Sequence, residues 1–299
     1  MSEKELENVI CNYCGADNYR SLFNKGRFNI VKCNSCGLVY TNPRIVQSSL
    51  KNIYEKDYYK SENSLTSGYD DYFRERPMIE ATFNMRIEFI LKKALDLHDV
   101  KEPIILDIGC AMGYLLDIFR RRGWRTEGIE LSEFAAQYAR EELKLNVQSG
   151  ALTKGQFPQD RFSLITSWDV IEHCPDPVGD LREIRSILMP GGYLSIITPN
   201  RGSLHAKFVG KNWVEYEKPE EHIYFFDEKI LGRILGKLGF KVIASTTAGK
   251  YVTMSFALRR LTTYLAIMGK VINSLNSKTL NKYLYVDPKD KMFVLAQKV

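Results

Sequence analysis

A short apolar run that breaks off in glycine constrains the fold of this chain more than any other feature. Residues 104–108 are apolar except for Asp107, and Gly109 and Gly113 follow within five residues. Such a run is typical of a buried parallel strand that turns tightly into a helix. Open α/β sheets bind their ligands at the carboxyl ends of these strands. The segment therefore predicts an α/β fold with a ligand site directly after this strand.

An acid and the glycine spacing narrow the class of ligand. Glu130 ends a second apolar run 21 residues after Gly109, where an acid can accept hydrogen bonds from both hydroxyls of a ribose. A dinucleotide fingerprint needs Gly-x-Gly-x-x-Gly, but Ala111 and Tyr114 occupy its second and third glycine positions. The lysine of a phosphate-binding P-loop is also missing. These residues predict a pocket for a nucleoside-containing cofactor other than a dinucleotide.

The pattern Asp-x-Gly-x-x-x-Gly resembles a known motif. Formed here by Asp107, Gly109 and Gly113, it is similar to motif I of the class I S-adenosylmethionine (SAM)-dependent methyltransferases, although Ala111 stands where the commonest form has glycine. The resemblance implies a Rossmann-like seven-stranded sheet whose first loop holds the methionine end of SAM. It places further residues at the cofactor, namely Tyr72, Leu131, Ala151, Leu152 and Trp168.

The resemblance continues in order along the chain. Later segments look like the fourth strand with its loop, the Pro-Gly-Gly turn with the fifth strand, and the terminal antiparallel pair: residues 162–173, 188–200, 240–243 and 292–298. One departure follows the third strand. The family often has an acid there for the adenine amino group, whereas residues 148–152 contain none. Backbone groups of Ala151 and Leu152 would therefore have to meet the adenine.

Two cysteine pairs stand near the start of the chain. Cys11-x-x-Cys14 and Cys33-x-x-Cys36 are separated by 18 residues, a spacing typical of a four-cysteine structural zinc site. Disulfides are the alternative. The charged start of the sequence lacks the apolar core of a signal peptide, so we expect a cytoplasmic protein with reduced thiols. Four ligands leave zinc no open position, which predicts a structural role.

Length and composition agree with one large domain and a small module. The chain has 299 residues and is 44% hydrophobic, enough to fill a sizeable core. We predict a zinc ribbon, a helical linker or lid, and a methyltransferase core with a substrate-binding insertion and a basic amphipathic segment: 1–43, 44–98, 99–299, near 201–228 and near 252–285.

The linker carries tyrosines ahead of a predicted helix. Pro77 should open this helix, which runs to about Leu97. Tyrosines in this position resemble the lid that closes over the cofactor in related enzymes, with surface packing as the alternative. They are Tyr58, Tyr59, Tyr69 and Tyr72.

The end of the chain is basic. The whole chain carries a net charge of +6, whereas residues 241–299 contain ten Lys or Arg and two acids. Apolar residues recur at helical spacing over 258–275. A basic amphipathic helix can lie on an anionic membrane, receive a pyrophosphate-bearing acceptor, or simply pack on its own core or a second subunit. No apolar stretch is long enough to span a bilayer.

Histidines are the candidate catalytic bases. SAM already carries an activated methyl group, so the protein must align an acceptor and remove its proton. Of four histidines, His173 follows the fourth strand and His222 follows the fifth. The pattern Glu221-His222-x-Tyr224 is similar to one in zinc-containing sugar C-methyltransferases, where a Glu–His pair serves as the base. Those enzymes have a further large carboxy-terminal domain that this sequence does not show. A packing role is the alternative for both histidines.

Together these features predict a SAM-dependent methyltransferase that methylates oxygen or carbon of a small molecule. The expected acceptor is a sugar, glycan precursor or secondary metabolite, nucleotide- or lipid-linked. A quinone-precursor O-methyltransferase is the alternative because its core motifs are the same. In the other alternative the ribbon reads RNA. Against this, the ribbon has few cations, and Trp168-Asp169-Val170 replaces the Asn/Asp-Pro-Pro motif of base N-methyltransferases. We therefore expect no nucleic-acid partner.

Overall fold

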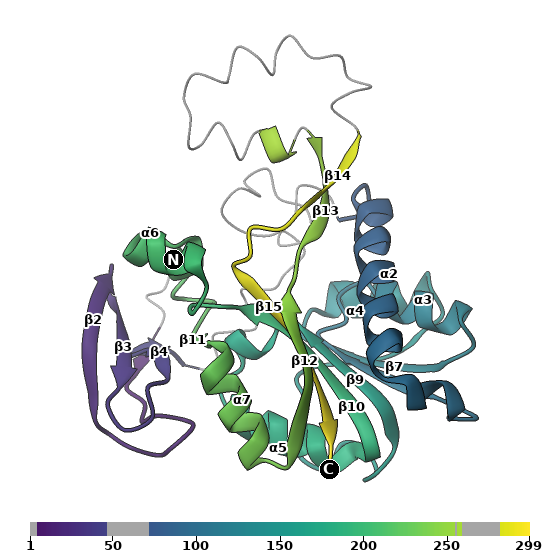
Figure 1. Cartoon of the computed structure of the whole chain (residues 1–299), viewed down its shortest axis with the longest axis horizontal. Coiled ribbons are helices and arrows are strands. Elements are labelled where there is room, and N and C mark those ends of the chain that lie inside the picture. Colours follow the sequence, from purple (N-terminus) through teal and green to yellow (C-terminus); the bar gives the residue numbers. More distant parts are fainter. Residues whose placement is uncertain (1–4, 47–71, 255, 259–281) are drawn as a thin grey trace.

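The computed structural model describes residues 5–46, 72–254, 256–258 and 282–299. Its main body is a sheet with helices on both faces, and a smaller sheet of amino-terminal strands lies beside it (Figure 1).

The predicted seven-stranded sheet is present. Its strand order is β12-β15-β10-β9-β6-β7-β8. The strands from β10 to β8 are parallel, whereas β15 runs antiparallel to both β10 and β12. The strands are β6 (Ile104–Ile108), β7 (Arg125–Glu130), β8 (Asn146–Ser149), β9 (Phe162–Trp168), β10 (Leu188–Pro199), β12 (Phe240–Thr247) and β15 (Lys291–Lys298). The Rossmann-like fold is therefore confirmed.

Helices cover both faces of this sheet. One face packs against α2 (Arg76–Lys93), α3 (Tyr114–Arg121) and α4 (Glu133–Glu141), and the other against α5 (Pro177–Ile187) and α7 (Glu228–Lys237). β15 is buried on both sides, because its successive side chains alternate between the two apolar clusters. The predicted helix at Pro77 is α2, and a 3₁₀ turn, Leu95–Asp99, follows it.

The ribbon consists of short antiparallel strands. β2 (Tyr19–Lys25), β3 (Phe28–Cys33) and β4 (Val39–Thr41) form a sheet, and β1 (Leu6–Glu7) pairs with β5 (Arg44–Ile45). The fourth strand of the ribbon sheet is β11 (Tyr224–Phe225), which comes from the predicted insertion near 201–228. That insertion also contains α6 (Leu204–Val209).

The ribbon and the main sheet share one apolar core. Cys11, Cys33 and Leu38 belong to the same buried cluster as Phe162 and Ile165 of β9. The small sheets also reach Ile45, two residues past the predicted end of the ribbon. In sequence the ribbon is a separate module, but in the fold it packs as one body with the sheet.

Parts of two sequence predictions lie outside the described residues. These are the lid tyrosines Tyr58, Tyr59 and Tyr69, and the amphipathic stripe from Leu261 onwards. On either side of that stripe, β13 (Lys250–Thr253) pairs with β14 (Tyr283–Val286). Within the described ranges, no helix has the length and apolarity needed to cross a bilayer.

Candidate active site

The loop after β6 has the backbone that its sequence predicts. Gly109 and Gly113 have φ angles of 75° and 80°, in the left-handed region that glycine adopts readily. A Cβ at Gly109 would lie 2.4 Å from Cγ2 of Val170, and one at Gly113 would lie 2.6 Å from Cδ1 of Leu145. Both glycines are therefore required by conformation and by close packing. Ala111 also has a positive φ, 47°, which an alanine adopts at a cost.

Glu130 closes this loop from the neighbouring strand. Its Oε2 accepts a hydrogen bond from the amide of Ala111 at 2.8 Å, and its Oε1 accepts one from the amide of Ser132 at 2.8 Å. The side chain is buried. A carboxylate oxygen can accept more than one hydrogen bond. The contact of Glu130 with a ribose stays a prediction.

Asp107 supports the loop from beneath. It is buried and accepts a hydrogen bond from Oγ1 of Thr166 at 2.6 Å, which joins β6 to β9 where the loop begins. Burial raises the pKa of Asp107 to about 7, with Glu130 adding to the effect and the Thr166 bond opposing it. The bond between Asp107 and Thr166 thus fixes the start of the loop.

The other predicted cofactor residues lie on several elements of the chain. Tyr72 is buried and stacks on Tyr114 at 5.3 Å between ring centroids. Trp168 ends β9 and donates its Nε1–H to Oγ of Ser195 at 2.9 Å, while the Arg86 guanidinium lies 5.2 Å from its ring centroid. Leu131 follows β7 and is half-buried, and Ala151 is exposed after β8.

A pocket lies at the carboxyl ends of β6 and β9. Its lining comes from both strands, the loops that follow β8 and β9, and α5: Ile108, Leu152, Ser167, Val170, Ile171, Cys174, Asp180, Leu181 and Ile184. Burial raises the pKa of Asp180 to about 6. Asp180 thus places an acid of α5 in the same lining as Leu152 of the loop after β8.

The loop after β9 carries Glu172 and His173. They lie in the 3₁₀ turn Ile171–His173, directly after Val170. Nδ1 of His173 lies 2.9 Å from the carbonyl oxygen of Glu221, and Nε2 lies 3.9 Å from Oε1 of Glu172. Burial, together with the nearby His222, lowers the pKa of His173 to about 3. His173 is therefore neutral at physiological pH, and its Nδ1 carries the proton that the Glu221 carbonyl accepts.

His222 meets His173 from the insertion. The ring centroids lie 4.6 Å apart and the planes are nearly perpendicular, at 87°. Nδ1 of His222 lies 3.1 Å from Oε2 of Glu215. Although burial opposes ionisation of Glu215, His222 and Lys291 lower its pKa to about 2. The carboxylate beside His222 is thus that of Glu215, whereas Glu221 contributes its backbone oxygen to His173.

The family follows from comparison of the chain with known proteins. The model of the methyltransferase domain family matches residues 81–245, more than half of the chain. The chain belongs to the methyltransferase domain family. That span includes the motif I loop, Glu130, His173 and His222, so the predicted family is confirmed.

Individual relatives of this methyltransferase match only part of it. It is 31% identical to a ubiquinone biosynthesis O-methyltransferase of Actinobacillus pleuropneumoniae over 127 residues, which cover 39% of this chain and 53% of that protein. The corresponding protein of Aeromonas salmonicida is 32% identical over 124 residues, covering 39% and 50%. The chain thus spans about half the length of these curated relatives.

Solved structures resemble the methyltransferase more distantly. A putative methyltransferase of Bacillus halodurans is 17% identical with a TM-score of 0.49, covering 70% of this chain and 98% of that one. A SAM-dependent methyltransferase of Archaeoglobus fulgidus is 19% identical with a TM-score of 0.49, covering 76% and 98%.

The sequence analysis did not predict one ion pair in the candidate site. Nζ of Lys291, at the start of β15, lies 2.7 Å from Oδ1 of Asp169, directly after β9. Burial opposes ionisation of both groups, but the pairing raises the pKa of Lys291 and lowers that of Asp169. The sequence signal for this pair was the position of its residues in the predicted strands. The carboxyl end of β9 and the beginning of the antiparallel β15 lie at the same edge of the sheet.

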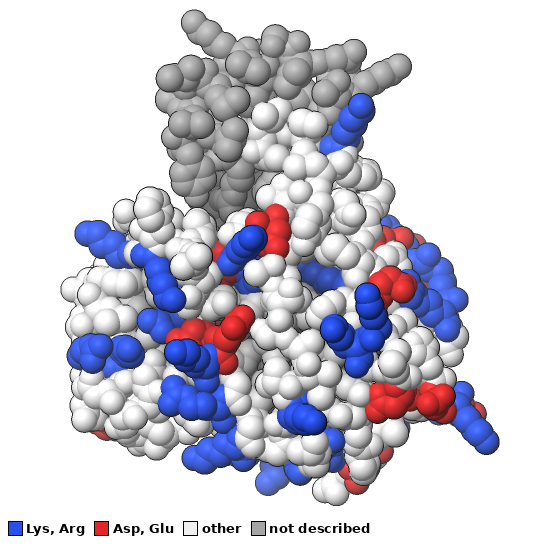
Figure 2. All heavy atoms as spheres, in the orientation of Figure 1, with Lys and Arg blue, Asp and Glu red and all other residues white. Residues whose placement is uncertain are grey.

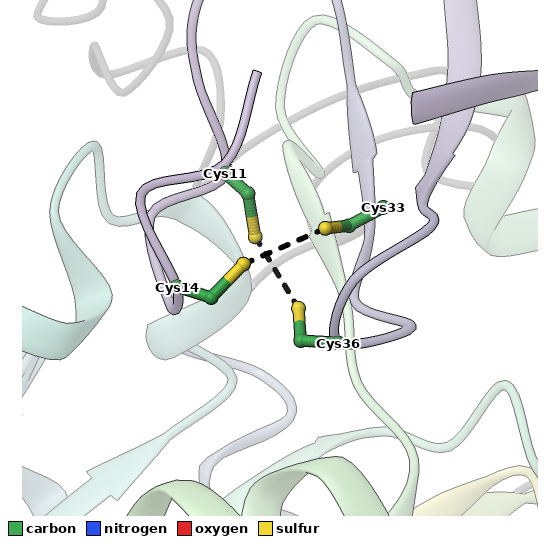
Figure 3. Close-up of side chains that lie close together, drawn as sticks. All are labelled: Cys11, Cys14, Cys33 and Cys36. Carbon is green, nitrogen blue, oxygen red and sulfur yellow. Dashed lines mark hydrogen bonds between the residues drawn. The ribbon is translucent and has the colours of Figure 1, made fainter. Parts of the chain in front are cut away.

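Two groups of described residues could hold a metal ion. In each, the ligand atoms lie within 4.8 Å of one another: the four cysteines, and the trio Glu172, His173 and His222. The four thiols point toward a common centre (Figure 3). The Sγ atoms of Cys11 and Cys36 lie 3.4 Å apart, and those of Cys14 and Cys33 lie 3.6 Å apart. Tetrahedral zinc with ~2.3 Å bonds would hold sulfurs ~3.8 Å apart, so the thiols fit such an ion.

Proposed function

We propose that this enzyme transfers the methyl group of SAM to oxygen or carbon of a small-molecule acceptor, with His222 as the base that removes the acceptor's proton. The expected acceptor class is a sugar, glycan precursor or secondary metabolite. One observation supports the proposal: the side chains of His173, His222 and Glu215 lie together. The loop that carries His173 also contains Val170, which packs against Gly109 of the motif I loop.

The geometry favours His222 over His173 as the base. Oε2 of the ionised Glu215 lies 3.1 Å from Nδ1 of His222, where a carboxylate can orient the imidazole of a catalytic base. Nδ1 of His173 instead donates to the neutral carbonyl of Glu221. Its low pKa also makes His173 a weak base. We assign it the role of orienting the acceptor or His222.

Bound SAM supplies a methyl group on a sulfonium centre, which is activated without further chemistry. The remaining task of the protein is alignment and proton removal. The motif I loop and Glu130 would hold the cofactor, as the resemblance implies, and Glu130 is hydrogen-bonded to the amide of Ala111 in that loop. His222 would then act from the opposite side, at the acceptor.

The direct test is a panel of acceptors. Nucleotide-linked keto-sugars and catechol-type quinone precursors would be incubated with SAM and the purified chain, with release of S-adenosylhomocysteine as the readout. We expect turnover with the sugars that is lost in His222→Ala. Turnover with catechols alone would instead support a quinone-precursor O-methyltransferase, which the names of the curated relatives favour.

We also propose that the four cysteines bind one structural zinc ion per chain. Metal analysis of the purified protein should find one equivalent, which Cys33→Ser should abolish. Cys174 lies outside the two cysteine pairs. Cys174→Ser is therefore the matched control and should retain the ion. Protein without zinc and without titratable thiols in the ribbon would contradict the proposal and favour disulfides.

A small-molecule acceptor agrees with the surface charge better than RNA does. Lys25 of the ribbon forms an ion pair with Glu217, and cationic side chains on the face in Figure 2 are scattered in small groups, several beside acids. RNA recognition would produce binding that weakens steeply with salt. We expect a salt titration with a mixed-sequence RNA to show no such specific binding.

A further inference from the structure

The first cysteine knuckle, the turn from Cys11 to Cys14, is hydrogen-bonded to the loop that carries His173. Asn12, between Cys11 and Cys14, donates from Nδ2 to Oδ1 of Asp176 at 2.7 Å. Its own Oδ1 accepts the amide of Val178 at 3.1 Å. Asp176 caps α5, and Val178 lies in the first turn of that helix, where amides lack partners within the helix. The knuckle thereby fixes the point where the His173 loop enters α5.

The second knuckle, the turn from Cys33 to Cys36, leads into a strand that is hydrogen-bonded to the segment that carries His222. β4 begins three residues after Cys36, and its last residue, Thr41, is fully buried. The amide of Thr41 donates to the carbonyl of Ile223 at 3.0 Å, and Oγ1 donates to the carbonyl of His222 at 3.3 Å. β11 then continues the pairing with β4.

The loop that carries His173 and the segment that carries His222 are also hydrogen-bonded to each other. The amide of Ile223 donates to the carbonyl of Glu172 at 2.9 Å, and His173 Nδ1 reaches the carbonyl of Glu221. Each knuckle is closed by its own backbone bonds, from Gly15 to Cys11 and from Gly37 to Cys33. An ion bound by all four thiols would hold the two knuckles, and hence the two histidine segments, in one arrangement (Figure 3).

We propose that the ribbon is a clamp that assembles the histidine side of the active site, with Asn12 and Thr41 as its positioning residues. The inference rests on the proposed function only in taking His173 and His222 to work on the acceptor. The hydrogen bonds of Asp107 and Glu130 described above go instead to Thr166, Ser132 and the loop itself. Loosening the clamp should therefore disturb acceptor chemistry and spare SAM binding.

The test compares two double variants of the full chain. Asn12→Ala with Thr41→Val removes the two clamp side chains and leaves all four cysteines in place. Asn18→Ala with Ser21→Ala removes the same kinds of group from bonds within the ribbon, to Asn34 and Asn29. Hydrogen exchange of the amides at 222–224, imidazole ¹⁵N shifts, zinc content and SAM calorimetry are measured on both.

We expect the clamp variant to exchange the amides of His222 and Ile223 at least tenfold faster and to change the ¹⁵N shifts of both imidazoles. Zinc should stay at one per chain and SAM affinity within threefold. Thr41→Ser in place of Thr41→Val should restore most of the protection, because it keeps the hydroxyl. Turnover on an accepted substrate should fall in kcat with an unchanged KM for SAM.

Unchanged exchange and shifts in the clamp variant, or equal changes in the control pair, would overturn the clamp. A loss of SAM affinity as large as the loss of protection would do the same, because it would mean general destabilisation. Full activity of His222→Ala would instead refute the proposed base, without altering the exchange and shift readouts. The two failures are therefore distinguishable.

Discussion

The cofactor side and the acceptor side of this active site are built in different ways. The proposed cofactor side is centred on one stretch of about thirty residues that ends at Ser132, where backbone amides and glycines meet the carboxylate of Glu130. The acceptor side draws on the ribbon, the loop after β9, the insertion and the start of β15. Catalytic geometry on that side depends on long-range packing.

The two sides also differ in charge. On the cofactor side, Asp107 is buried with a neutral hydroxyl as its partner. The acceptor side gathers Asp169, Glu172 and Glu215 around Lys291 and two histidines. Buried ion pairs add little net stability because desolvation offsets their attraction. Such a cluster of perturbed pKa values is typical of a functional site.

The largest expected effect is a loss of turnover from a change on the acceptor side alone. His222→Ala should lower turnover by about 10²–10⁴-fold, the usual contribution of a general base, while SAM affinity by calorimetry stays within a few-fold. His173→Ala is made in parallel. A greater loss at His173 would transfer the role of base to the loop after β9. Full activity in both variants would mean that the acceptor arrives already nucleophilic.

A change at Glu130 should break the cofactor side alone. Glu130→Ala should weaken SAM binding by about 1.5–3 kcal/mol, the range for hydrogen bonds to a charged group, with kcat at saturating SAM retained. Glu127→Ala is the matched control, because Glu127 lies in the same strand but pairs with Arg161. Unchanged calorimetric affinity in Glu130→Ala would refute the ribose contact.

The pH dependence of stability should separate the two sides more finely. The pKa of Asp107 is about 7 in the folded protein, above its ordinary value of 3.8. The folded state thus holds a proton that the unfolded state releases, so this group makes unfolding easier as pH rises from about 4 to 7. Asp107→Asn should remove that slope, so the stability of this variant relative to wild type should increase by about 2–3 kcal/mol from pH 5 to pH 8.

Denaturant titrations at several pH values would measure this gain. Glu172→Gln should behave similarly, since the pKa of Glu172 is also raised to about 7, by burial and by Asp169. His173 acts in the opposite sense, because its lowered pKa makes stability rise with pH between about 3 and 6.5. A constant difference between wild type and Asp107→Asn over this range would contradict the raised pKa of Asp107.

The smallest expected effect concerns Ala111. Its φ of 47° is costly for alanine, so Ala111→Gly should stabilise the fold by about 0.5–1 kcal/mol, as judged by thermal unfolding. SAM affinity should hold or improve, because the amide that Glu130 binds is unchanged. Destabilisation would mean that the methyl group of Ala111 packs favourably enough to outweigh the backbone cost.

Local features of the chain were predictable in detail. Six of the seven strands of the main sheet, the turn at Gly109, the placement of Glu130 and the convergence of the four cysteines agree with their sequence patterns. Each pattern is short and is imposed by backbone conformation or by ligand geometry. Glu215, Asp169, Lys291 and Asp180 escaped prediction because each is an ordinary charged residue in its own sequence context.

The sequence by itself determined the fold, the family, the cofactor loop and the cysteine knuckles, because strand periodicity, glycine spacing and paired cysteines act over a few residues. Only the tertiary structure decided which carboxylate lies beside His222, and that β11 completes the ribbon sheet. It also brought Thr41 to His222 across 181 residues of chain. The physical reason is that such contacts depend on which distant strands pair and which buried charges need partners, and no local pattern carries that information.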